Sequence, residues 1–389
     1  MQTSRGGNLA MGLPYYDNAA TTQVDSRVAE IVMRYMVEEF GNSGSRTHTY
    51  GSSARSAVEV ARAHVAAVVD AEEDEVIFTS GATEADNMAL LGLAEEGLRS
   101  GRRHIITSVV EHKAVLEPLE YLATQGFEVT VLPVKSSGAI DMDAFRVALR
   151  DDTLLVSIMH VNNETGVIQP LEEIAEVLVD RDIWFHVDGA QGFGKSIEAL
   201  RNKRIDMISI SGHKIYAPKG VGALIIRKRP DRSRAPLKPL MYGGGQERGL
   251  RPGTVPVALV AGLGEASRLA LLEHKARWEA GKKTEKIVVD LVEKAGGVIN
   301  GDRANAIPFI VNASFPGLDS EAFIVSTKSI IAISNGAACS SHSYERSHVL
   351  LAMSLEDRVV GSAIRFSFSH DAEIFDSAAL VHQIDSVRF

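Results

Sequence analysis

The sequence predicts an α/β fold: a large, mostly parallel sheet of seven strands with helices on both faces, followed by a smaller α+β domain. Three observations predict it. Apolar runs alternate with helical patterns through most of the chain. The runs are near-continuous in Val, Ile and Leu, as in strands that are covered on both faces. After about residue 255 the alternation gives way to a long helical pattern and a few short elements.

The elements follow in order along the chain. The expected strands of the large sheet are 76–78, 103–108, 128–132, 154–159, 183–187, 207–210 and 222–226. The expected helices between them are 83–99, 113–124, 141–150 and 171–179. The smaller domain is expected to contain helices 255–280, 320–327 and 347–353 and strands 309–311 and 364–367.

Composition limits the function classes. The chain has 389 residues, 45% of them hydrophobic, which is enough for two or three domains. No apolar run reaches the length of about 18 residues that a membrane span needs. Residues 1–12 are polar and Gly-rich, and we expect a flexible leader there. The single cysteine excludes an intrachain disulfide and a Cys-rich metal site, and it suits a reducing cytoplasm.

Charge argues against direct nucleic-acid binding, because the formal net charge is −9 and phosphate binding needs a basic face. One local exception is the basic stretch, residues 227–240 (RKRPDRSRAPLKPL). It is interpreted either as a solvated, Pro-broken connection or as a docking patch for an acidic partner.

Two polar residues follow neighbouring predicted strands. Asp188 comes directly after strand 183–187, and Lys214 lies in a Gly/Ser-rich turn after strand 207–210. Ligands of open α/β sheets bind at the carboxyl ends of strands. An Asp that pairs with a ring nitrogen and a Lys that bonds an aldehyde are what pyridoxal phosphate requires. By itself, an Asp at a strand end is more often a turn or cap residue.

Other candidates surround this pair. Thr83 opens a helix after strand 76–78, where a helix N-terminus attracts phosphate, although an ordinary N-cap has the same pattern. Ser211 and His213 are further phosphate candidates. His112 follows another strand and is placed either to stack on a cofactor or to serve a structural role.

Two residues indicate chemistry in the smaller domain. Cys339 lies among small and polar residues (SNGAACSSHS), which favours an exposed loop over the usual buried thiol. Arg365 interrupts an apolar strand, and a substrate carboxylate is a good bidentate partner for Arg.

Taken together, these segments resemble the cysteine desulfurases of the class-V aminotransferase-like group, which are fold type I pyridoxal-phosphate enzymes. The resemblance runs from the YDNAATT motif at 16–22 to about Phe368, and it includes residues 40–43, 157–166 and 243–249. The joint order of the motifs makes it specific.

The resemblance implies a large pyridoxal-phosphate domain over 27–262 and a small domain over 263–389, with 13–26 packing on the small domain. It implies these roles in cofactor binding: Lys214 as Schiff-base lysine, Asp188 at the pyridine nitrogen, His112 on the ring, Gln191 at the phenolic oxygen, and Ala82, Thr83, Ser211 and His213 at the phosphate. Thr254 would reach the phosphate from the partner subunit, which implies a homodimer. Asn163 and Arg365 would bind the substrate carboxylate, and no metal is implied.

The implied reaction converts L-cysteine to L-alanine with a persulfide on Cys339, in which His112 is a candidate proton acceptor for the thiol. The sulfur then passes to an acceptor protein, for iron–sulfur cluster assembly or DNA phosphorothioation. Gly189 and Pro252 depart from the usual family residues, and both bear on backbone shape. The chain ends at Phe389, without the longer tail that helps housekeeping desulfurases dock their scaffold, which favours a dedicated desulfurase. A selenocysteine lyase or aminotransferase of the same fold, and a non-catalytic sulfur-pathway scaffold, are the alternatives.

Overall fold

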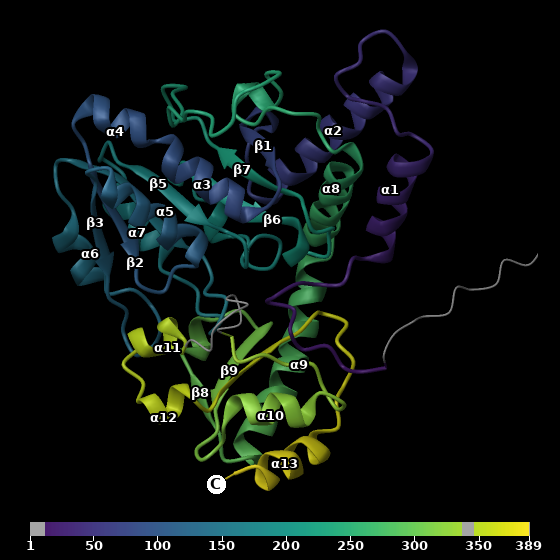
Figure 1. Ribbon diagram of the computed structural model, residues 1–389, viewed down its shortest axis with the longest axis vertical. Coiled ribbons are helices and arrows are strands. Elements are labelled where there is room, and N and C mark those ends of the chain that lie inside the picture. Colours follow the sequence, from purple (N-terminus) through teal and green to yellow (C-terminus); the bar gives the residue numbers. More distant parts are fainter. Residues whose placement is uncertain (1–11, 337–345, 389) are drawn as a thin grey trace, which may run out of the picture.

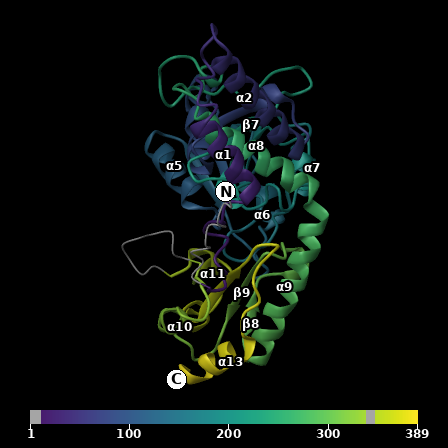
Figure 2. The same ribbon diagram turned by 90° about the vertical axis from the view of Figure 1, so that its right-hand side faces the viewer.

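The computed structural model describes residues 12–336 and 346–388, and it confirms the expected fold class. Figures 1 and 2 show a large upper part built on one sheet and a smaller lower part built on a second, with the long helix α9 (His274–Lys294) running into the lower part.

The large sheet has the strand order β1-β7-β6-β5-β4-β2-β3 within the described residues. Its strands are β1 (Val76–Thr79), β2 (His104–Ser108), β3 (Glu128–Leu132), β4 (Thr153–Met159), β5 (Trp184–Asp188), β6 (Met207–Ser211) and β7 (Gly222–Ile226). Strand β7 is antiparallel to both neighbours, and the other pairs are parallel. All seven lie within one or two residues of their expected positions.

Helices cover both faces of this sheet, as Figure 1 shows. They are α1 (Ser26–Val37), α2 (Thr49–Val68), α3 (Ala82–Gly92), α4 (Ala94–Ser100), α5 (Lys113–Thr124), α6 (Met142–Ala148), α7 (Leu171–Leu178) and α8 (Val257–Leu272). Successive strand residues point to opposite faces. In β7, Ala223 and Ile225 belong to the buried apolar cluster that includes residues of α2, α7 and α8, whereas Leu224 and Ile226 belong to the cluster that includes residues of α3 and α5.

The smaller part is an antiparallel sheet of order β10-β9-β8 with helices around it. Its elements after α9 are β8 (Val298–Asn300), β9 (Ile310–Ser314), α10 (Ser320–Thr327), α11 (His348–Ala352), α12 (Asp357–Val360), β10 (Ala363–Ser367) and α13 (Ser377–Ser386). The segment before α1 joins this part: the Asn18 N–H donates to the Ser367 carbonyl (2.9 Å). The expected domain boundary after residue 262 falls within α8, and the division into domains stays a proposal.

Several helices differ from expectation. The expected helix 83–99 is two helices separated at Leu93, and the expected helix 255–280 is α8 and α9, separated at Glu273. Sequence reasoning assigned no element to α1, α2, β8, α12 or α13. Across residues 12–336 and 346–388, no helix combines the length and the apolarity that crossing a membrane requires.

Candidate active site

A cavity of about 480 Å³ opens where the carboxyl ends of β1, β5 and β6 meet residues of the smaller part. Ten of the site residues predicted from the sequence line it: Ala82, Thr83, His112, Asn163, Asp188, Gln191, Ser211, His213, Lys214 and Arg365. These positions come from both parts of the chain, so only the folded chain assembles them.

The start of α3 forms one end of the cavity. Its N-cap is Gly81, which has no side chain that could accept a hydrogen bond from the first turn. The N–H groups of Ala82 and Thr83, at the start of the helix, also have no carbonyl partner within the helix. A Cβ at Gly222 would lie 2.7 Å from the Gly81 Cα, so the absence of a side chain there lets this turn approach β7. The unpaired N–H groups and the helix dipole suit a phosphate.

Lys214 ends a single 3₁₀ turn that follows β6. Its Nζ donates to the carbonyl oxygens of Ala19 and Ala20, the latter at 2.8 Å. The chain then turns at Tyr216, whose φ of +69° is rare for a bulky residue. The Tyr216 N–H donates to the Thr22 hydroxyl (2.9 Å), which holds this turn against the N-terminal segment.

Two buried acids, Asp188 and Asp86, form part of the cavity lining. Asp188 ends β5, and its Oδ1 accepts the Ala190 N–H (2.9 Å). Asp86 of α3 is fully buried, with the His186 Nε2 3.5 Å from its Oδ1. Burial raises the pKa of both aspartates, and it lowers the pKa of His186 to about 3, so that ring is neutral. A cationic ring nitrogen beside Asp188 would therefore compensate its buried charge.

His112 and Gln191 flank the same space. The His112 Nδ1 accepts the Ala114 N–H (3.1 Å) and so caps α5, which is a structural role. The His112 ring also lines the cavity. Gln191 donates from Nε2 to the Ala19 carbonyl (2.8 Å). Its Oε1 lies 3.5 Å from the Nζ of Lys195, a buried residue that sequence reasoning missed. Burial, reinforced by the Lys214 charge, lowers the pKa of Lys195 to about 7.

Arg365 reaches the cavity from β10. Its Nη1 donates to the Asn163 carbonyl (3.0 Å), and its Nη2 donates to Asp17 Oδ1 (2.7 Å). Asp17 belongs to the YDNAATT motif at 16–22, but nothing in the sequence around it indicates that it pairs with Arg365.

One predicted residue that the structure describes lies away from this cavity. Thr254 is exposed and does not line it. Cys339 lies outside the described residues. The lining that is described fits pyridoxal phosphate: an amine at Lys214, a buried carboxylate at Asp188 and open N–H groups at the start of α3.

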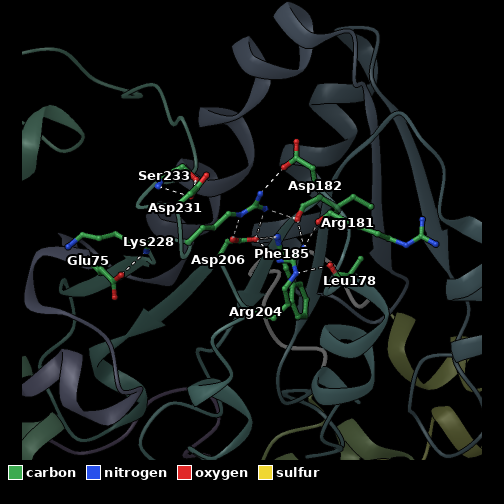
Figure 3. Close-up of polar contacts among 12 residues, drawn as sticks. Glu75, Leu178, Arg181, Asp182, Phe185, Arg204, Asp206, Lys228, Asp231 and Ser233 are labelled. Atoms are coloured by element: carbon green, nitrogen blue, oxygen red, sulfur yellow. Dashed lines mark hydrogen bonds and ion pairs between the residues drawn. The ribbon is translucent and has the colours of Figure 1, made fainter.

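The basic stretch is not a free patch. Arg227 is buried and donates to the carbonyls of Val69 and Leu200 (2.6 and 2.7 Å). Lys228 pairs with Asp74. Other members of the network, among them Arg204, Asp206 and Asp182, gather at the start of β5 and β6 in Figure 3.

Arg229 pairs there with both Asp182 and Asp206, and its guanidinium carbon lies 3.7 Å from the centre of the Trp184 ring. Residues 227–229 are thus engaged within the chain, because Arg227 is buried against carbonyls and Lys228 and Arg229 pair with carboxylates, so a docking role for the stretch would fall to its later residues.

Comparisons with known proteins show similarity over nearly the whole chain. The model of the aminotransferase class-V family matches residues 14–377. The chain is 44% identical over 386 residues to cysteine desulfurase IscS of Vibrio cholerae serotype O1 (strain M66-2), covering 97% of this chain and 94% of that protein.

Two solved structures are similar. The crystal structure of DndA from Streptomyces lividans is 51% identical, has a TM-score of 0.80, and is matched over 91% of this chain and 99% of that one. The structure of SspA in complex with cysteine is 36% identical, with a TM-score of 0.80 over 91% of this chain and 98% of that one.

Proposed function

This chain belongs to the class-V aminotransferase family, and from that premise we propose which of its residues carry the chemistry of a cysteine desulfurase. The chain is a pyridoxal-phosphate-dependent cysteine desulfurase that acts on L-cysteine in sulfur transfer. The single observation that supports the residue assignment is that Lys214, Asp188 and Arg365 line one cavity.

The cofactor site uses both ends of the cavity. We assign the phosphate to the start of α3 (Ala82, Thr83) with Ser211 and His213, because open N–H groups and hydroxyl or imidazole donors converge there. Asp188 supports the ring nitrogen, while His112 and Gln191 contact the ring. When bound, pyridoxal phosphate supplies an electron sink for the bond cleavages at the substrate.

Three residues act on the substrate. Arg365 and the Asn163 side chain bind the carboxylate of L-cysteine and so orient its Cα. Lys214 is the base that removes the Cα proton, and it later returns a proton. Its position between the Ala19 and Ala20 carbonyls keeps the amine at the cavity edge.

Cys339 accepts the sulfur. Its thiolate attacks the substrate sulfur, so that an S–S bond forms as the C–S bond breaks, and the three-carbon product leaves as L-alanine. A free thiol has a pKa of about 8.5, so the reaction needs a proton acceptor, for which His112 is the candidate. Because the attacking thiol must stay reduced until it meets the substrate, we place the enzyme in the cytoplasm.

The active enzyme is a homodimer. Thr254 is exposed in the single chain, which suits a residue that acts at the partner's phosphate site. Large apolar side chains are exposed nearby in the sequence and on α1: Tyr242 is 86% exposed, and Met33 is 57% exposed. A two-fold interface over such residues would make the contact of Thr254 reciprocal.

The sulfur acceptor is a protein, in iron–sulfur cluster assembly or in DNA phosphorothioation. To distinguish these two pathways, the persulfide form is incubated with an iron–sulfur scaffold protein or with a DNA-modification enzyme. The measurement is which of the two proteins gains sulfur. Transfer to neither, with transfer to a third acceptor, would exclude both pathways.

The assignment is tested by incubating the holoenzyme with L-cysteine and measuring alanine and the mass of the protein. We expect alanine and the gain of a sulfur atom on Cys339, and the Cys339→Ser variant should bind the cofactor but form no persulfide. An amino-transfer product without a persulfide would favour the aminotransferase alternative. A strong preference for L-selenocysteine would favour the lyase.

A further inference from the structure

The guanidinium group of Arg365 is already partly occupied. Its side chain is only 4% exposed, and it offers five N–H bonds. Nη1 donates to the Asn163 carbonyl, and Nη2 donates to Asp17 Oδ1. Nε is buried and has no partner among the residues that the structure describes. Two of the five N–H bonds are therefore committed within the chain, and one of these is on Nη2, the nitrogen that Asp17 binds.

Neither member of this pair depends on a ligand for its position. Arg365 lies in β10, opposite Asn312 of β9, and its N–H donates to the Ser334 carbonyl (2.7 Å). The Asp17 carbonyl accepts the Tyr15 hydroxyl (3.1 Å) and the Ala20 N–H (3.0 Å). Contacts within the chain thus hold both backbones, and the two side chains they carry pair with each other.

We propose that Asp17 is a built-in competitor for the substrate carboxylate at Arg365 and so sets how weakly the enzyme holds amino acids. This inference rests on the proposed carboxylate-binding role of Arg365. A carboxylate that enters the cavity meets a neutralised pair instead of a free cation, and its own charge lies close to that of Asp17.

The charge balance around Arg365 supports this competition. A second acid near Arg365, among the residues that the structure describes, is Glu164, which is buried and whose Oε2 accepts from the Ser347 hydroxyl. Burial raises the pKa of Glu164 and favours its neutral form. Asp17 is 24% exposed, so water stabilises its charge. It is thus the negative group that an incoming carboxylate has to share Arg365 with.

Competition by Asp17 would weaken binding of the product, L-alanine, as well as of the substrate, L-cysteine. L-Alanine carries the same carboxylate as L-cysteine, so any interaction that tightens one also tightens the other. By weakening this shared contact, Asp17 favours release of alanine, and discrimination between the two is left to the part of the cavity that receives the thiol.

The test is the Asp17→Asn holoenzyme, because the amide has the same shape and still accepts from Arg365. The dissociation constant for L-alanine, measured from the absorbance change of the bound cofactor and from thermal stabilisation, should fall about tenfold, equivalent to about 1.4 kcal/mol. Binding of cysteamine, which lacks the carboxylate, should not change.

Two further variants make the result specific. Glu285→Gln removes one charge from a similarly part-buried ion pair with Arg303, away from the cavity, and should leave alanine binding unchanged. Arg365→Gln should weaken alanine binding; if it does not, the assigned role of Arg365 fails.

If Arg365→Gln weakens alanine binding but Asp17→Asn leaves it unchanged or weakens it, then Asp17 only orients Arg365. That result would overturn the proposal that Asp17 competes with the substrate carboxylate. Asp17→Ser, which is shorter and uncharged, should also tighten alanine binding and replaces Asp17→Asn if that variant does not fold.

Discussion

Asp206 holds together the starts of the two strands that lead to Asp188 and Lys214. It is 3% exposed, and its Oδ2 accepts the Phe185 N–H of β5 (2.8 Å). It also pairs with Arg204 and Arg229, each at 2.8 Å. Replacing it by alanine leaves the buried N–H and the two guanidinium groups without this shared acceptor.

The expected loss in the free energy of unfolding follows from what remains. Removing one partner of a buried ion pair costs about 3–5 kcal/mol. Arg229 keeps Asp182, and Arg204 keeps carbonyl acceptors including that of Leu178, so we expect a value near the lower end, about 3 kcal/mol, for Asp206→Ala. Asp206→Asn still accepts the Phe185 N–H and should cost about half as much.

The measurement is urea-induced unfolding of the holoenzyme, followed by circular dichroism at one fixed protein concentration. Asp231→Ala is the control, because Asp231 bonds to Ser233 alone among the described residues, near the surface, and should change stability by less than about 0.5 kcal/mol. Alanine production per folded molecule should be unchanged in Asp206→Ala, because Asp206 does not line the cavity. A loss of stability below about 1 kcal/mol would show that the arginines do not depend on this carboxylate.

The remaining predictions concern the site and the assembly. Lys214→Ala should abolish both alanine production and the absorbance of the bound cofactor; undiminished turnover would contradict its role as base. Light scattering at assay concentration should give a dimer, and Thr254→Ala should weaken cofactor binding; a fully active monomer would exclude the shared site. Because burial lowers the pKa of Lys195 from 10.5 to about 7, the unfolded chain binds more protons in that range, so the free energy of unfolding should rise with pH there. Lys195→Met should remove this part of the pH dependence, and an unchanged slope would assign it to other groups. Binding to duplex DNA should be weak at physiological salt, because the net charge is −9 and Arg227 is buried; tight, salt-sensitive binding in a gel-shift assay would refute this.

The sequence by itself determined the order of the elements and the main chemistry of the cavity. Strands covered on both faces appear as apolar runs, so the fully buried β7 lies at its expected residues. Because parallel strands end at one edge of a sheet, Asp188 after β5 and Lys214 after β6 could be expected to meet. The missed helix α1 also had a local signal, since Asp25 caps it and Val28 and Val32 form its buried face.

Only the tertiary structure decided which distant charges meet. The basic stretch has the composition of a docking patch, yet Arg229 pairs with Asp182 and Asp206. Likewise, Asp17 and Arg365 lie at opposite ends of the chain, and their contact is made only when the N-terminal segment joins β10. Periodicity and capping are local properties, whereas the partner of a charged side chain depends on which distant segments the fold brings within reach of it.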